Sequence, residues 1–318
     1  MGDGAARNKS SAGETHLILE ELQRLVTEQR NERTRDIDLV DVETCLQWIN
    51  DEDAHVAPAV RAQIPLIARA VGAAERSLRA GGRLVYLGAG TSGRLGVLDA
   101  SECPPTFGSD PDQVIGVIAG GSAALVRAQE GAEDREDAAV RDLVAIGLES
   151  RDTLVGLSAS RRTPYVIAGL RHASGIGAAT VFVTCNTPAA DVAADIVIAV
   201  VVGPEVVAGS TRLKSGTAQK LVLNMISTAT MIRLGKVYEN LMVDLRPSSI
   251  KLEERSKGIL MQLLAIPYAD AVALLDAARG SVKLALFMGL AGCARDEAEA
   301  RLQAAGGVLR RALGKELT

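Results

Sequence analysis

Short apolar segments alternate with helical segments through the middle of the chain, and this alternation restricts the fold more than any other feature. Segments with the composition of buried strands, bounded by Gly, Ser or Pro, lie at 84–87, 114–119, 153–158, 179–184 and 196–201. Helical segments surround them, at about 58–78, 93–102, 123–128, 135–146, 164–173 and 211–234. The alternation predicts an α/β fold, a parallel sheet flanked by helices on both faces.

The two ends of the chain differ from this middle part. Most of 14–80 has helical periodicity, which predicts an N-terminal helical segment. From 249 the chain is rich in Ala and Leu and indicates a small helical bundle, with two short helices over 296–313. We therefore expect a disordered tip at 1–13, an α/β domain with its N-terminal helices at 14–248, and a small helical C-terminal domain at 249–318.

Composition excludes several functional classes. Of the 318 residues, 47% are hydrophobic, 23% charged and only 3% aromatic, as in a globular chain of helices packed on a parallel sheet. The net charge is −4 and no long basic run occurs, which argues against a nucleic-acid partner. The four cysteines show no paired spacing, and neither a signal peptide nor a bilayer-length apolar run is evident. We expect a cytoplasmic protein with free thiols and no membrane partner.

A glycine-rich turn, Leu-Gly-Ala-Gly-Thr-Ser-Gly-Arg-Leu-Gly at 87–96, follows the first strand and opens a helix. Free backbone N–H groups and the helix dipole make such a helix start a ready anion site. The turn also matches the dinucleotide pattern G-x-G-x-x-G, but the acidic residue expected about 20 positions further on is missing. A purely structural turn is the other alternative. The hydroxyls of Thr91 and Ser92 favour a phosphomonoester site.

A second polar loop, Ser-Ala-Ser-Arg-Arg-Thr-Pro at 158–164, follows another apolar strand. One hydroxyl at such a junction is an ordinary helix cap, and Pro164 suits a first helical position. Three hydroxyls, those of Ser158, Ser160 and Thr163, exceed what capping requires. Since ligands of α/β folds bind at the carboxyl ends of strands, we expect both loops to converge on one phosphate.

Two glutamates are candidates for acid–base chemistry on a phosphorylated small molecule. Glu102 lies ten residues beyond Ser92, before a Pro-Pro pair, and Glu133 lies in an acidic cluster at a helix start. Acids in a first helical turn are often only partners of the helix dipole. The histidines His16, His55 and His172 show no metal-ligand spacing, so we expect no metal, and the chain has no nucleophile-elbow motif.

Several long, uninterrupted motifs of this chain resemble those of the N-acetylmuramic acid 6-phosphate etherases. That family belongs to the sugar isomerase (SIS) superfamily of phosphosugar-binding domains. The motifs cover 49–53, 87–96, 99–106, 130–134, 162–170, 214–224 and 240–244, within a resemblance that spans roughly 27–313. The resemblance implies a SIS-type sheet and cleavage of the D-lactyl ether of N-acetylmuramic acid 6-phosphate. The products are N-acetylglucosamine 6-phosphate and D-lactate, in cell-wall recycling and amino-sugar catabolism. It further implies a homodimer with the active site near the subunit interface, and no metal or organic cofactor.

The same resemblance implies roles for individual residues. Glu102 would protonate the departing lactate oxygen and Glu133 would remove the proton on carbon 2. The phosphate would be bound by Ser92, Ser158, Ser160 and Thr163, supported by Thr91 and Gly93. Glu205 and Lys214 are candidate substrate contacts from a neighbouring subunit, or else surface charges near a helix start. Arg161 departs from the pattern, because the family usually has glycine there.

Two other functions are compatible with the same phosphate loops. One is a phosphosugar-binding regulator without turnover, like the glucokinase regulatory protein. The other is an aldose–ketose phosphosugar isomerase, which needs one base. The glutamate pair argues against the regulator, and the Ser-Glu-Cys-Pro-Pro segment at 101–105 favours the etherase over the isomerase.

Overall fold

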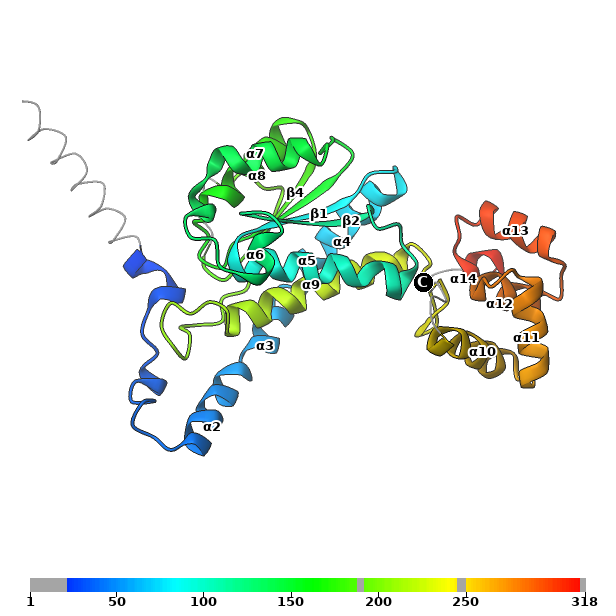
Figure 1. Cartoon of the computed structure of the whole chain (residues 1–318), viewed down its shortest axis with the longest axis horizontal. Helices are drawn as coiled ribbons and strands as arrows, with labels where there is room; N and C mark the ends of the chain where they lie inside the picture. Colours follow the sequence, from blue (N-terminus) through cyan, green and yellow to red (C-terminus); the bar gives the residue numbers. More distant parts are fainter. Residues whose placement is uncertain (1–21, 188–191, 245–249, 315–318) are drawn as a thin grey trace, which may run out of the picture.

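A parallel sheet forms the centre of the computed structural model, which describes residues 22–187, 192–244 and 250–314 (Figure 1). Its strands are β1 (Leu84–Gly88), β2 (Val114–Ile118), β3 (Thr153–Leu157), β4 (Ala179–Thr184) and β5 (Ile196–Ala199), in the order β2-β1-β3-β4-β5. All neighbouring pairs in this sheet are parallel. The predicted α/β fold is confirmed, and the strands end within two residues of the predicted positions.

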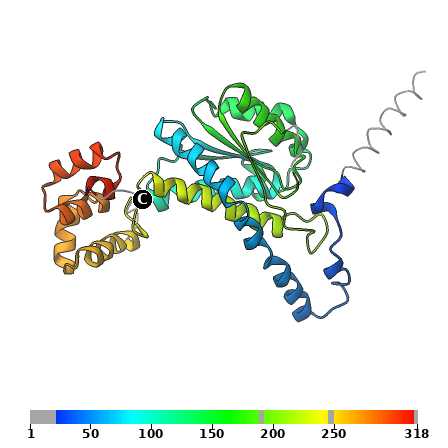
Figure 2. The same cartoon turned by 180° about the vertical axis from the view of Figure 1, so that it is seen from behind.

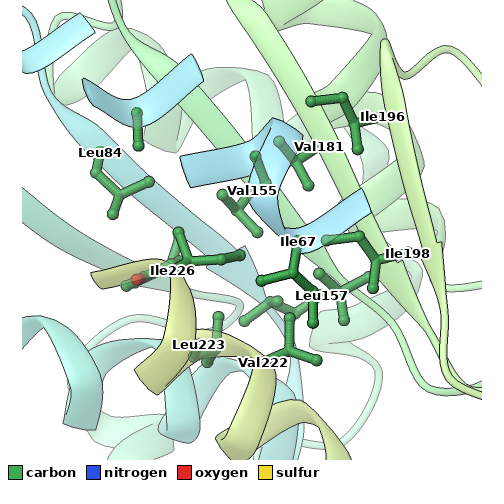
Figure 3. Packing of buried hydrophobic residues seen from close by; sticks show 14 of the residues in the cluster. Ile67, Leu84, Val155, Leu157, Val181, Ile196, Ile198, Val222, Leu223 and Ile226 are labelled. Atoms are coloured by element: carbon green, nitrogen blue, oxygen red, sulfur yellow. The ribbon is translucent and has the colours of Figure 1, made fainter. Parts of the chain in front are cut away.

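Helices cover both faces of the sheet, as Figures 1 and 2 show. One face is covered by α4 (Ile64–Arg79), α5 (Gly90–Phe107) and α9 (Lys214–Arg233), and the other by α7 (Glu136–Ala145) and α8 (Pro164–Gly175). The short α6 (Ala123–Val126) and the 3₁₀ helix η3 (Ala132–Asp134) lie between β2 and α7. In Figure 3, side chains of α4, the strands and α9 meet in one apolar cluster that includes Ile67, Leu157 and Ile226.

Prolines change two predicted helices in opposite ways. The segment predicted as one helix over 58–78 is broken into α3 (Val56–Arg61) and α4. Pro65, in the first turn of α4, has no N–H group that could donate to the carbonyl of Arg61 and continue the helix. By contrast, α5 does not stop at 102 but continues through both prolines to Phe107 and ends at Gly108. The side chains of Cys103 and Phe107 are buried on the sheet, and this packing holds the last turn despite the lost N–H donors.

The ends of the described chain are helical. Before the sheet come η1 (Val26–Glu28), η2 (Glu32–Thr34) and α2 (Val42–Asp53). After α9, a hairpin that the sequence did not predict, β6 (Val237–Tyr238) and β7 (Leu241–Met242), precedes the predicted C-terminal helices. These are α10 (Ile250–Leu264), α11 (Tyr268–Ala277), α12 (Val282–Ala291), α13 (Arg295–Ala304) and α14 (Leu309–Ala312).

The C-terminal helices have a hydrophobic core of their own, which also takes in Tyr238 and Val243. The predicted tip at 1–13 and the predicted domain boundary at 248/249 lie outside the described residues. Within the described ranges, no single helix is long and apolar enough to cross a membrane. The helices α10 and α11 reach that length and apolarity only when taken together, and they are bent by 109° at the break between them.

The contact between α5 and β2 depends on glycine at one position. A Cβ atom at Gly116 would lie 2.5 Å from Cα and 2.7 Å from N of Val97, which are backbone atoms of α5. We therefore expect Gly116→Ala to lower the free energy of unfolding by about 1–3 kcal/mol, the usual cost of overpacking. Gly175→Ala in α8 is the matched control, because nothing lies within 4 Å of its added methyl group. Thermal unfolding checks this; a Gly116→Ala melting temperature equal to that of the control would contradict it.

Candidate functional site

The candidate site lies at the carboxyl ends of β1 and β3, where the strand order of the sheet reverses. Gly88 of β1 pairs with Leu157 of β3, while the chain continues from β1 to β2 on one side and from β3 to β4 on the other. In open parallel sheets, ligands bind in the crevice that such a reversal leaves at the carboxyl ends of the strands. The two predicted hydroxyl-bearing loops start from these two strand ends, so they are neighbours in the fold.

The first loop joins β1 to α5 by a very close turn. A Cβ atom at Gly93 would lie 2.7 Å from the carbonyl oxygen of Gly88, so both positions require glycine. The helix begins at Gly90, directly after Ala89, and no side chain caps it. The N–H groups of Gly90, Thr91 and Ser92 therefore have no intrahelical acceptor and carry the positive end of the helix dipole. The predicted residues Thr91, Ser92 and Gly93 all lie in this first turn.

The second loop gathers three hydroxyls at the start of α8. The Oγ of Ser158 and the Oγ1 of Thr163 are 2.8 Å apart. The Thr163 N–H donates to the Ser158 Oγ, and the Arg162 N–H donates to the Ser160 Oγ, each at 3.4 Å. Thr163 is the residue at the N-cap position, yet its side chain does not cap the helix. The predicted residues Ser158, Ser160 and Thr163 thus lie together in one loop.

Arg161, the departure from the family pattern, has a left-handed backbone with φ of 64°. Its N–H donates to the carbonyl of Ser158 at 3.1 Å and closes the turn. Glycine adopts this conformation freely, whereas another residue bears a cost of about 1–2 kcal/mol. The Nη1 of Arg161 donates to the carbonyl of Thr187 at 2.6 Å, so the arginine keeps the turn that the family glycine favours.

Glu205 and Lys214 are both fully buried, so the surface-charge alternative for these two residues is wrong. The Glu205 carboxylate accepts hydrogen bonds from the N–H groups of Lys214 at 2.9 Å and Ser215 at 3.0 Å. It therefore caps α9, and the N-terminus of this helix already holds an anion. The predicted role of Glu205 as a substrate contact stays a prediction.

The Lys214 ammonium is paired with Glu52, a residue that the sequence analysis did not single out. The Nζ of Lys214 lies 2.5 Å from one carboxylate oxygen of Glu52, and the Nε of Arg33 lies 2.5 Å from the other. Burial alone would raise the pKa of Glu52, but hydrogen bonds from Arg33 and Lys214 outweigh it and lower the pKa below the ordinary 4.5. Glu52 lies in the motif at 49–53, and that motif was the only signal in the sequence.

The two candidate acid–base residues lie in different cavities of one chain. Glu133, in η3, lines a cavity of about 160 Å³ together with Ala89, Gly90 and Arg94, so it adjoins the start of α5. Glu102 is ten residues beyond Ser92, which is about 15 Å along the helix. It lines a separate cavity of about 220 Å³, with Asp99 and Lys220 among the other lining residues. Glu133, and not Glu102, is therefore the glutamate beside the first loop.

The buried neighbours of Glu102 are structural. Asp99 accepts hydrogen bonds from the Tyr86 hydroxyl at 2.8 Å and from the Asn224 amide at 2.7 Å, and so ties α5 to β1 and α9.

Burial raises the pKa of the Cys103 and Cys185 thiols to about 12, so neither supplies a thiolate near neutral pH. Among the described residues, no group of three or more His, Cys, Asp or Glu side chains is arranged to hold a metal ion.

Comparison with known proteins shows the family of the chain. Residues 66–174 match the family model of the glucokinase regulatory protein N-terminal SIS domain, and the fold is SIS-like. The chain is 53% identical over 294 residues to the N-acetylmuramic acid 6-phosphate etherase of Geobacillus sp. (strain WCH70), covering 92% of this chain and 99% of the relative. It is 54% identical to the enzyme of the same name from Mycolicibacterium smegmatis, with the same coverage. The chain belongs to the N-acetylmuramic acid 6-phosphate etherase family.

Solved structures are more distant. A phosphoheptose isomerase from Francisella tularensis aligns with a TM-score of 0.44 and 16% identity, covering 59% of this chain and 98% of that one.

Lys214→Met removes one of the two cationic partners of the buried Glu52 carboxylate and leaves it with Arg33 alone. We expect this substitution to lower the free energy of unfolding by about 1–3 kcal/mol, the cost of one lost hydrogen-bond partner at a buried group. Lys220→Met, at an exposed position of the same helix, is the control and should change it by less than about 0.5 kcal/mol. Urea unfolding measures both; equal stabilities of the two variants would contradict the account.

Because the pKa of Glu52 is lowered in the folded protein, the ionised carboxylate adds to the free energy of unfolding above pH 4.5, and this contribution is lost as the pH falls further.

Proposed function

We propose that this chain cleaves the D-lactyl ether of N-acetylmuramic acid 6-phosphate and releases N-acetylglucosamine 6-phosphate and D-lactate. The observation that carries the proposal is the identity of 53% with a relative of this name over 92% of the chain. The reversal of strand order between β1 and β3, with an uncapped helix start at its edge, supports it because a phosphorylated substrate needs such an anion site.

The phosphate binds, in this proposal, over the first turn of α5. The N–H groups of Thr91 and Ser92 donate to it, and the hydroxyls of Ser158, Ser160 and Thr163 approach from the neighbouring loop. The start of α9 is an unsuitable alternative, because the Glu205 carboxylate already occupies its N–H groups. Direct contacts with substrate would require Glu205 to release the N–H groups of α9 and Lys214 to leave Glu52.

The reaction follows from the chemistry of the substrate. An ether is hard to hydrolyse directly, because an alkoxide is a poor leaving group. Opening of the sugar ring exposes an aldehyde, which acidifies the proton on carbon 2. Glu133 removes this proton, the C3–O bond breaks, and Glu102 protonates the departing lactate oxygen. Water then adds its oxygen to carbon 3 and a proton returns to carbon 2. Each positioned proton transfer contributes about 10²–10⁴-fold to the rate.

We propose that a homodimer completes the site, with Glu102 of one subunit acting beside Glu133 of the other. The separation of these glutamates into two cavities within one chain supports this arrangement. The helices α5 and α9 also expose apolar side chains, Leu98, Met225 and Ile232, of the kind that subunit contacts bury. We place the protein in the cytoplasm, where its four free cysteines remain reduced.

Release of D-lactate from N-acetylmuramic acid 6-phosphate tests the activity. We expect the wild type to release it, and Glu102→Gln and Glu133→Gln each to lower kcat about 10²–10⁴-fold, since each removes one proton transfer. Glu136→Gln, at an exposed position that begins α7, is the control and should retain wild-type activity.

The alternatives give different results in the same assay. A folded wild type that binds the phosphosugar without releasing lactate would be a regulator, and aldose–ketose interconversion would reveal an isomerase. Either result would overturn the etherase proposal.

Mixing two inactive variants tests the shared site. If Glu102 and Glu133 act across the subunit interface, unfolding and refolding an equimolar mixture of Glu102→Gln and Glu133→Gln creates sites with both glutamates intact. Random pairing of subunits then restores about a quarter of the wild-type activity. Each variant treated alone is the control and should stay inactive. If the mixture also stays inactive although mixed dimers form, both glutamates act within one chain.

A further inference from the structure

We infer that Gln219 is a positioning residue of the phosphate site, which sets the direction in which the Ser92 hydroxyl donates. The inference rests on the proposed function, because it assumes that the phosphate of the substrate binds at the start of α5. Gln219 lies in the motif at 214–224, but neither the sequence analysis nor the proposed mechanism gives it a role.

Gln219 and Ser92 form a buried contact between α9 and α5. The Ser92 Oγ donates to the Gln219 Oε1 at 2.8 Å. Only 1% of Gln219 and 8% of Ser92 is exposed. The start of α9 also adjoins the loop, since a Cβ atom at Gly216 would lie 3.5 Å from the Thr91 methyl carbon. Gln219 is thus directly behind the phosphate loop, and it reaches the ligand through Ser92.

The other end of the amide is buried without an acceptor. Among the residues that the structure describes, none accepts a hydrogen bond from the Gln219 Nε2. A buried N–H group in this state is unfavourable by about 1–3 kcal/mol, whereas a carbonyl oxygen without a donor is more readily accommodated, so exchanging the positions of the two amide atoms is favourable. This unsatisfied donor, beside a hydroxyl of the phosphate loop, is the observation that points to a second arrangement.

Rotation of the amide by half a turn gives that arrangement. The Nε2 then donates to the Ser92 Oγ, and the Ser92 hydroxyl proton is free to be donated to a phosphate oxygen. In the present arrangement the same proton is held by the Gln219 Oε1 and is turned away from the ligand. Bound phosphate favours the rotated amide, because a hydrogen bond to a charged acceptor is stronger than one to a neutral amide oxygen.

A carboxylate at this position removes the second arrangement. In Gln219→Glu the ionised side chain accepts only, keeps the Ser92 proton, and places a negative charge behind the phosphate. We expect N-acetylglucosamine 6-phosphate to bind this variant about tenfold or more weakly above neutral pH. As the pH falls and the carboxyl group is protonated, it donates as the amide does, and binding should recover relative to wild type. Calorimetric titration of both proteins at each pH measures the ratio.

Gln219→Met is the matched uncharged variant. It loses the orienting hydrogen bond, and we expect the phosphosugar to bind about threefold to tenfold more weakly, independently of pH. If Gln219 acts through Ser92, the Met substitution should cause no further loss of binding in a Ser92→Ala background. Thermal unfolding confirms that each variant is folded, and Gln303→Met, the same substitution at an exposed position of α13, serves as the control.

The outcomes separate the two claims. Wild-type binding with an unchanged Gln219→Glu affinity at every pH, or losses from Gln219→Met and Ser92→Ala that simply add, would overturn the role of Gln219 alone. Failure of the wild type to bind the phosphosugar at all would overturn the proposed function, and this inference with it.

Discussion

The close backbone contact between Gly88 and Gly93 is the constraint from which the candidate site follows. It lets α5 begin immediately after β1, so that its first N–H groups point to the edge where the strand order reverses. A side chain at Gly93 would meet the backbone of Gly88 and the side chain of Ile118, and would push the helix start away from the sheet. The neighbouring helix α9 is then aligned on α5 by buried polar contacts, those of Asp99 with Asn224 and of Ser92 with Gln219.

Buried polar groups also join the N-terminal segment to this edge. Glu52 of α2 holds the Lys214 ammonium at the start of α9. The Asn186 side chain accepts a hydrogen bond from the Val26 N–H at 2.7 Å and donates to the Ala159 carbonyl at 2.9 Å, so it links η1 to the second loop. Such buried groups are costly unless each is satisfied, and together they specify one arrangement of segments that are far apart in the sequence.

Much of this architecture was predictable because it rests on local signals. The strands are short and apolar on both faces, which is typical of a covered parallel sheet, and the hydroxyl-rich loops follow two of them. The positions of Glu102 and Glu133 were not predictable in the same way. Glu102 is close to Ser92 in the sequence, but the helix α5 carries it away from the loop. Glu133 is further along the chain, yet the connection after β2 brings it back to the start of α5. The pairing of Lys214 with Glu52 joins residues more than 160 positions apart, and no local pattern reveals it.

A crystal structure of the protein with N-acetylglucosamine 6-phosphate tests the central claim most directly. The account predicts the phosphate over the first turn of α5, within hydrogen-bond distance of the N–H groups of Thr91 and Ser92 and of at least one hydroxyl among Ser158, Ser160 and Thr163. A phosphate bound elsewhere, for example at the start of α9 after displacement of the Glu205 carboxylate, would contradict it.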